Sequence, residues 1–184
     1  MCNKFLRFLT GALLLAWAAA AQQFGPAESL GPVISTPQNI VDRMLEAAHV
    51  KPGEVVYDLG SGDGRILISA VQKFGARAVG IEIDPDQVEK ARHRIHALGL
   101  DDKISVLHAS ALRADLRPAD VVTMYFLTST NEKLKPNLEK CLRPGTRVVS
   151  NQFPIKGWKA SEAVIVKMGA VEHTIYVYRI GQTK

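Results

Sequence analysis

The sequence predicts an α/β fold in which a doubly wound parallel sheet closes with an antiparallel hairpin. Short apolar runs alternate with segments of helical periodicity as far as about residue 151, and such alternation builds parallel sheets with right-handed crossovers. A glycine-rich turn at residues 60–64 separates the first apolar run from the helix that follows it. The last two apolar runs have no helix between them, which predicts a terminal antiparallel hairpin.

The N-terminal segment differs in composition from the rest of the chain. Lys4 and Arg7 precede a short apolar run at residues 8–17 and an alanine-rich exit, an arrangement typical of a secretory signal peptide. The run is short for a membrane-spanning helix, which needs about 20 residues. We therefore expect residues 1–21 to be a signal peptide, with an N-terminal anchor as the alternative, and residues 22–35 to be a linker. The protein is then exported or membrane-anchored; the alternatives are the cytoplasmic face and an organelle.

The charge of the chain argues against a nucleic-acid partner. The formal net charge is +5 at pH 7, and removal of residues 1–21, which hold Lys4 and Arg7 and no acid, leaves +3. This is mild for a nucleic-acid-binding domain. A basic run in the second half is expected to be a solvated helix face, with a patch for an acidic partner as the alternative; it comprises Lys133, Lys135, Lys140, Arg143 and Arg147.

The cysteine and histidine residues do not predict a metal site. Cys141 is the one cysteine outside the leader, and we expect it to be a small core residue. No Cys or His cluster has metal-ligand spacing, so no metal is expected.

The folded domain is expected to span residues 36–184 and to begin with a helix. Thr36 is the expected N-cap and Pro37 the first helical residue. The residues at about 120–127 form a continuous apolar run, which is typical of a strand buried on both faces. Further helices are expected at about 66–74, 85–98 and 129–142, and strands at about 54–59, 78–83, 103–107, 120–127, 146–151, 162–168 and 173–180.

The glycine turn and two acids form the candidate binding constellation. Asp58 ends the first strand, and Gly60, Gly62 and Gly64 follow at alternate positions. This G-x-G-x-G pattern differs from the G-x-G-x-x-G of dinucleotide folds, and an acid in front of it suits a cation such as the ammonium of a methionine moiety. Glu82, at the tip of the second strand, can accept hydrogen bonds from ribose hydroxyls. The alternatives are a simple glycine turn and a surface or helix-capping acid; together the two features predict binding of S-adenosylmethionine (SAM).

The stretches around these motifs resemble one family. The glycine turn resembles motif I of class I SAM-dependent methyltransferases. Six segments together resemble the archaeal-type broad-specificity protein-lysine methyltransferases and their mitochondrial relatives: residues 36–45, 56–66, 80–85, 121–128, 131–136 and 142–150. The resemblance covers residues 33 to 181 and implies a Rossmann-like, seven-stranded class I methyltransferase sheet. It also implies transfer of methyl groups to lysine ε-amines of proteins.

The same resemblance implies roles for individual residues. Thr36 and Pro37 lie in the segment that closes on the cofactor; Asp58, Gly60, Gly62 and Gly64 hold its methionine part; Glu82 holds its ribose. Ser110 flanks the adenine, where many methyltransferases have Asp or Asn. Tyr125, Phe126 and Leu127 line the methyl-transfer site, with a role in the core as the alternative. The tip of the fourth strand lacks the Asn/Asp-Pro-Pro-Tyr/Phe of amino-methylating DNA enzymes, which also disfavours a nucleic-acid substrate.

Two other functions stay open at this point. One is methyl transfer to a small molecule. The other is an exported, non-catalytic binding module, because SAM is made in the cytoplasm and the leader points elsewhere. We expect the protein to be a monomer, and any membrane association to run through the leader alone.

Overall fold

The computed structural model describes Leu30 and residues 35–184. The predicted leader and nearly all of the predicted linker lie outside these described residues. The elements, in chain order, are α1 (Gln38–Ala47), β1 (Val55–Leu59), α2 (Arg65–Phe74), β2 (Arg77–Glu82), α3 (Pro85–Ala97), β3 (Ile104–His108), β4 (Val121–Met124), α4 (Thr128–Cys141), β5 (Arg147–Asn151), β6 (Glu162–Met168) and β7 (Val171–Arg179).

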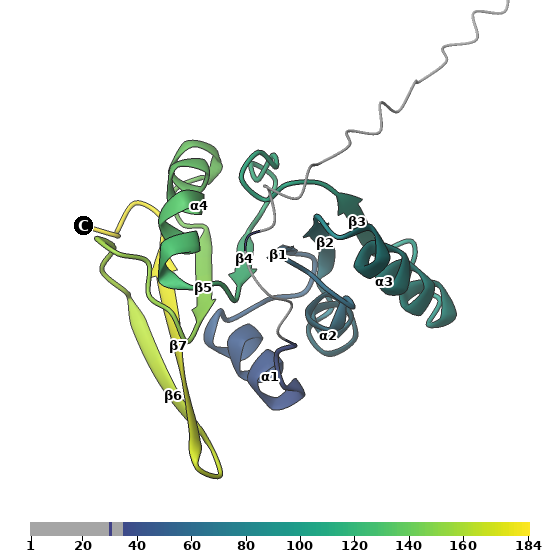
Figure 1. Ribbon diagram of the computed structural model, residues 1–184, viewed down its shortest axis with the longest axis horizontal. Coiled ribbons are helices and arrows are strands. Elements are labelled where there is room, and N and C mark those ends of the chain that lie inside the picture. Colours follow the sequence, from purple (N-terminus) through teal and green to yellow (C-terminus); the bar gives the residue numbers. More distant parts are fainter. Residues whose placement is uncertain (1–29, 31–34) are drawn as a thin grey trace, which may run out of the picture.

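The strands form one seven-stranded sheet in the order β3-β2-β1-β4-β5-β7-β6 (Figure 1). Strands β1 to β5 are parallel to one another, whereas β7 is antiparallel to both β5 and β6. This confirms the predicted doubly wound sheet with its terminal hairpin. The strand order reverses between β1 and β4, and ligands of such sheets bind at the carboxyl ends of the strands beside that switch point.

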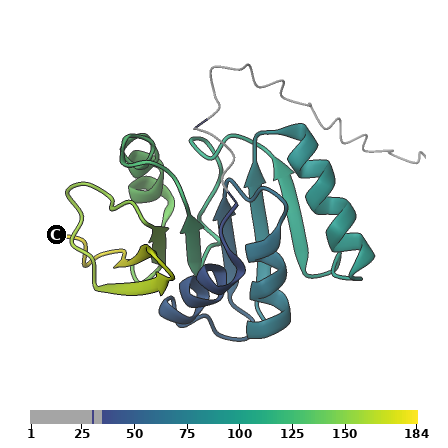
Figure 2. The same ribbon diagram turned by 60° about the horizontal axis from the view of Figure 1, so that its bottom comes forward.

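Helices cover both faces of the sheet. Successive side chains of a strand point to opposite faces, so one strand can pack against both layers of helices. On one face, Val56 of β1 packs with α1 and α2 in a common apolar cluster, and Figure 2 shows these two helices on the same side of the strands. On the other face, Tyr57 packs with Leu134 and Leu138 of α4. Cys141, predicted to be a small core residue, is partly buried against this second cluster.

The first helix begins one residue later than predicted. Pro37, not Thr36, is the N-cap, and it has extended dihedral angles of φ −57° and ψ 145°. Its carbonyl accepts hydrogen bonds from the N–H groups of Ile40 and Val41. The Thr36 side chain therefore makes no cap, and its backbone carbonyl is left to bind another side chain.

The fourth strand is shorter than its apolar run. The strand ends at Met124, and its four residues are all buried, as predicted. Residues 125–127 leave the sheet because Leu127 is the N-cap of α4, and its carbonyl accepts from the N–H groups of Thr130 and Asn131. Tyr125 and Phe126 are consequently half-buried at the strand tip instead of belonging to the strand.

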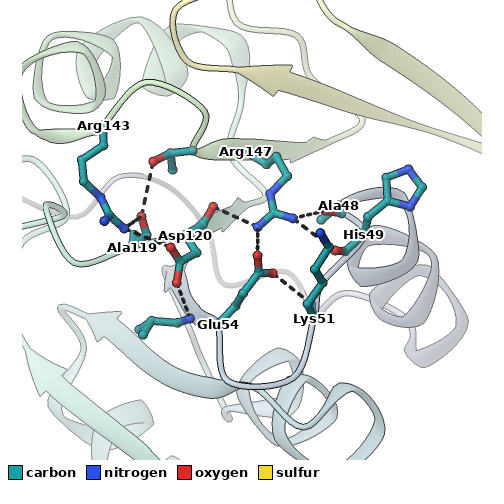
Figure 3. A network of polar contacts seen from close by, with 10 residues as sticks. Ala48, His49, Lys51, Glu54, Ala119, Asp120, Arg143 and Arg147 are labelled. Carbon is teal, nitrogen blue, oxygen red and sulfur yellow. Dashed lines mark hydrogen bonds and ion pairs between the residues drawn. The ribbon is translucent and has the colours of Figure 1, made fainter.

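The prediction of a solvated basic face was wrong for Arg147. Lys133, Lys140 and Arg143 are exposed, but Arg147 is buried at the start of β5. Its guanidinium donates to the carbonyls of Ala48 and His49, each at 3.1 Å, and pairs with Glu54 at 2.7 Å (Figure 3). The carbonyls at the end of a helix lack partners within the helix, so Arg147 ties the end of α1 to the amino-terminal edge of the sheet.

No helix in the described part of the chain has the length and apolar character needed to cross a membrane.

Candidate functional site

A cavity of about 230 Å³ opens at the carboxyl ends of the central strands. Its walls come from the tips of β1, β2 and β4, the glycine loop, the start of α3 and the segment in front of α1. Most of the predicted site residues line it, namely Thr36, Asp58, Gly60, Gly62, Glu82, Tyr125 and Phe126. The structure therefore brings together residues that are far apart in the sequence, at the place where a doubly wound sheet binds ligands.

Four predicted site residues do not line the cavity. Pro37 caps α1, and Leu127 is 47% exposed at the start of α4. Gly64 is the N-cap of α2 with a φ of +77°, and a Cβ there would lie 3.4 Å from Cβ of Ala91 in α3. Ser110 is buried between two cavity residues, Ala109 and Ala111, and its Oγ has no hydrogen-bond partner among the described residues.

The glycine loop is tied to the neighbouring strand β2. The N–H groups of Gly60 and Ser61 donate to the carbonyl of Ile81, at 2.8 and 3.2 Å. The N–H of Gly62 donates to Oε2 of Glu82 at 2.8 Å. Glu82 is almost fully buried, so its carboxylate holds the loop in place as well as facing the cavity.

Gly60 also marks the closest approach of the loop to the β4 tip. Its φ is +72°, and a Cβ there would lie 2.8 Å from Cζ of Phe126. Both the left-handed backbone and the close ring require a glycine. The loop and the aromatic tip of β4 thus form adjoining walls of one cavity.

Asp58 is the buried acid of the site. Its side chain faces the cavity, and its Oδ1 accepts a hydrogen bond of 2.7 Å from Oγ1 of Thr123. Burial raises the pKa of Asp58 to about 8; the Thr123 hydrogen bond lowers it, while the charges of Glu82 and Asp63 raise it further. A carboxyl group of this kind is neutral in the empty protein at pH 7, and a bound cation would ionise it.

Asp63 and Arg65 also line the cavity, although they are not among the predicted site residues. Nε and Nη2 of Arg65 donate to the two oxygens of Asp63, each at 2.9 Å, and Nη1 donates to the carbonyl of Thr36 at 2.8 Å. Burial raises the pKa of Asp63, but the hydrogen bonds and charge of Arg65, with the charge of Arg94, leave it below the ordinary value. Arg65 thereby joins the glycine loop to the segment in front of α1.

Several other residues that line the cavity were not predicted as site residues, although they lie close in sequence to the predicted ones. Gln87 and Lys90 lie one helical turn apart after the Asp84 cap, and Ala109 and Ala111 flank the predicted Ser110. Helical spacing after a predicted strand end would have indicated Gln87 and Lys90. No comparable signal marks Leu30, whose carbonyl accepts from Oγ1 of Thr130 at 2.9 Å.

Within Leu30 and residues 35–184, no three His, Cys, Asp or Glu side chains are grouped so that they could hold a metal ion.

The fold and the site define the class of the protein. A seven-stranded sheet with a terminal antiparallel hairpin, and a switch-point cavity framed by a glycine loop and two acids, are those of a SAM-dependent methyltransferase. The family described as the ANTKMT methyltransferase domain matches residues 58–162. The chain belongs to this family.

Similar proteins agree with that assignment. The chain is 46% identical over 154 residues to a protein-lysine N-methyltransferase of Saccharolobus islandicus, covering 83% of this chain and 96% of the relative. It is 31% identical over 128 residues to the adenine nucleotide translocase lysine N-methyltransferase of Mus musculus, covering 70% of this chain and 56% of that longer protein. A solved structure described as an RNA methyltransferase from Salinibacter ruber with S-adenosyl-L-homocysteine is 46% identical, with a TM-score of 0.75 over 80% of this chain and 94% of that one.

Proposed function

We propose that this protein transfers the methyl group of SAM to lysine ε-amino groups of proteins. The observation that carries the proposal is the aromatic tip of β4, where Tyr125 and Phe126 line the cavity beside the glycine loop. The archaeal relative of nearly the same length, described as a protein-lysine N-methyltransferase, supports the same substrate.

The cavity residues fit SAM. Gly60 and Gly62 present backbone without Cβ atoms, and a Cβ at Gly62 would meet nothing within 4 Å. The buried carboxyl of Asp58 offers an anion to the ammonium of the cofactor. Oε1 of Glu82 accepts from the N–H groups of Ile83 and Asp84, whereas Oε2 accepts from one N–H, that of Gly62. Because each carboxylate oxygen has about two acceptor sites, Oε2 keeps one for a ribose hydroxyl.

The reaction also requires a correctly placed and deprotonated acceptor lysine. When bound, SAM supplies an electrophilic methyl group on a sulfonium, and the acceptor nitrogen must lie about 3–3.5 Å from it, in line with the departing sulfur. A lysine has a reference pKa of about 10.4 and must lose its proton first. Desolvation beside the Tyr125 and Phe126 rings lowers the pKa of an incoming lysine and favours the neutral amine. The released proton passes to solvent.

RNA is the second candidate substrate, and the Salinibacter ruber structure favours it by its description. Two features of this chain argue against a nucleic-acid substrate. The β4 tip reads Met-Tyr-Phe-Leu at residues 124–127, without the Asn/Asp-Pro-Pro-Tyr/Phe of amino-methylating DNA enzymes, and the net charge of the chain is a mild +5.

Methyl-labelled SAM separates these candidates. The full chain is incubated with tritiated SAM and with three separate fractions of a cell extract: protein, RNA and small molecules. The Glu82→Ala variant serves as the inactive control. Label recovered as methyl-lysine after hydrolysis of the protein fraction supports the proposal. Label confined to RNA or to small molecules overturns it.

We also propose that residues 1–21 direct a monomeric enzyme to the membrane or beyond it. The support is compositional: a basic start, a short apolar run and an alanine-rich exit. Fractionation of cells that express the chain with a C-terminal tag tests this. Recovery of the full-length protein in the cytoplasm alone would refute the proposal.

A further inference from the structure

The aromatic ring of Tyr125 packs against a second ring, that of Phe153. The rings of Tyr125 and Phe153 are stacked, with centroids 6.1 Å apart and planes inclined by 23°. Tyr125 lines the cavity, whereas Phe153 follows the end of β5, the strand next to β4. The two residues therefore extend an aromatic wall from the cavity towards the carboxyl end of β5.

The backbone in front of Phe153 is strained. Gln152 has a φ of +66°, in the left-handed region that non-glycine residues seldom occupy. Thr174 of β7 holds it from both sides: the Gln152 N–H donates to the Thr174 carbonyl at 2.7 Å, and the Thr174 N–H donates to Oε1 of Gln152 at 3.3 Å. Such strain persists where the surroundings enforce it, and it clusters at functional sites.

Buried polar side chains fix the residue that follows. The carbonyl of Phe153 accepts from Oγ of Ser150 at 2.6 Å and from Nδ2 of Asn131 at 3.0 Å. Ser150 and Asn131 are both fully buried. The strained residue and the two buried polar side chains thus fix the backbone from which the Phe153 ring projects.

We propose that Phe153 is a positioning residue for methyl transfer, which holds the Tyr125 ring in place against the cavity where the acceptor lysine enters. The inference rests on the proposed lysine substrate and deepens it. An offset stack of this kind adds a modest energy beyond burial. Loss of the ring should therefore loosen Tyr125 and lower kcat/KM for the acceptor by about five- to tenfold, without changing the affinity for SAM.

The test compares variants of the full chain. Phe153→Leu removes the ring but keeps an apolar side chain, and Phe153→Tyr restores a ring. Phe74→Leu is the matched control, because Phe74 is a partly buried aromatic residue packed on the opposite face of the sheet. For each variant, initial rates are measured against the concentration of the extract fraction that takes the label, the SAM Kd by calorimetry, and Tm by thermal unfolding.

The expected result has three parts. Phe153→Leu lowers kcat/KM about five- to tenfold with a SAM Kd unchanged within about twofold, Phe153→Tyr restores most of the loss, and Phe74→Leu changes Tm alone. In a Tyr125→Leu background, Phe153→Leu has little further effect, because it acts through Tyr125. An unchanged kcat/KM in Phe153→Leu, or losses that simply add in the double variant, would overturn the inference.

Failure of the lysine proposal is seen separately. It appears in the wild-type protein as label in RNA or small molecules. The variants are then compared on that acceptor, and the same three results decide whether Phe153 positions Tyr125.

Discussion

Thr123 on β4 donates a hydrogen bond of 2.7 Å from Oγ1 to Oδ1 of Asp58 on β1. The parallel register of the two strands places these residues opposite each other, and both are buried. The bond supplies one partner to an acid whose pKa burial raises to about 8. At pH 7 this carboxyl group is therefore protonated in the SAM-free protein, and a bound cation would favour its ionised form.

Replacing Asp58 by Asn should stabilise the empty protein at neutral and mildly alkaline pH. The pKa of Asp58 in the folded protein, about 8, lies above its ordinary value of 3.8. As pH rises through this window, the unfolded chain releases the proton while the native state retains it, so the wild type loses stability. Asp58→Asn has no such proton. Its free energy of unfolding, measured by urea titration, should exceed that of the wild type by a margin that grows from about pH 4 to about pH 8.

The same variant should lose SAM binding, since a neutral amide cannot pair with the ammonium group. Calorimetry at about pH 7.5 measures this directly. A stability difference that does not change with pH would mean that Asp58 is already ionised in the empty site.

The local part of this site could be predicted from the sequence, and the reason is physical. Asp58 and Glu82 each end an apolar run, and parallel strands bring their carboxyl ends to one edge. The pairing of Asp58 with Thr123 could not be predicted, because the two residues are 65 positions apart and only the register of β1 against β4 joins them. The stack of Phe153 on Tyr125 depends in the same way on how β5 ends.

The mispredicted positions have equally specific causes. The apolar run that begins at Asp120 continues to Leu127, but the chain leaves the sheet at Met124 to begin α4. Hydropathy cannot distinguish an apolar strand from an apolar wall of a cavity. Arg147 carries a charge and so was expected to be exposed; it is buried because the carbonyls of Ala48 and His49, just after α1, and the Glu54 carboxylate need a donor.

Gly60→Ala should destabilise the protein more than Gly62→Ala. Both glycines have a positive φ, +72° and +50°, so alanine is strained at either position. Only at Gly60 would the added Cβ meet a ring, that of Phe126 at 2.8 Å, whereas nothing lies within 4 Å at Gly62. Overpacking of this kind costs about 1–3 kcal/mol, and urea unfolding of the two variants measures the difference.

A Phe126→Leu background provides the check on that cause. The smaller side chain leaves room, so the extra cost of Gly60→Ala over Gly62→Ala should shrink. An equal cost for Gly60→Ala in both backgrounds would assign the effect to the backbone alone.

Glu82→Gln and Glu82→Ala should separate the two tasks of Glu82. The amide oxygen of Gln can still accept from the N–H groups of Ile83 and Asp84, but its NH2 group cannot accept from the N–H of Gly62, so Glu82→Gln should lose only part of the stability. It should weaken SAM binding by about 10–100-fold, because charged hydrogen bonds contribute about 1.5–3 kcal/mol. Glu82→Ala leaves the N–H groups of Gly62, Ile83 and Asp84 without the carboxylate that they contact, and it should lose both SAM binding and stability.

Glu89→Gln is the matched control, since Glu89 is an exposed carboxylate on α3 outside the cavity. Calorimetry with SAM and thermal unfolding are run on all three variants. Wild-type SAM affinity in Glu82→Gln would show that the ribose does not depend on the charge of Glu82.

Arg65→Lys should weaken SAM binding while leaving most of the stability intact. The planar guanidinium makes a bidentate pair with Asp63 and a third bond to the Thr36 carbonyl. A lysine keeps the charge but cannot reproduce this fork. Thr36, a wall of the cavity, would lose its tie to the glycine loop, and we expect the SAM Kd to rise about tenfold, equivalent to about 1.4 kcal/mol.

Lys73→Met is the control for this last prediction. Lys73 joins α2 to α1 through an ion pair of 2.6 Å with Asp42. Neither Lys73 nor Asp42 lines the cavity. Half of the Lys73 side chain is exposed, and such pairs contribute about 0–1 kcal/mol, so Lys73→Met should leave the SAM Kd unchanged. Asp63→Asn combined with Arg65→Lys should cost less than the sum of the two single changes, since both break one unit. Additive losses, or a weakened Kd in Lys73→Met, would show that the affinity depends on the general docking of α1 and not on the contact between Arg65 and Thr36.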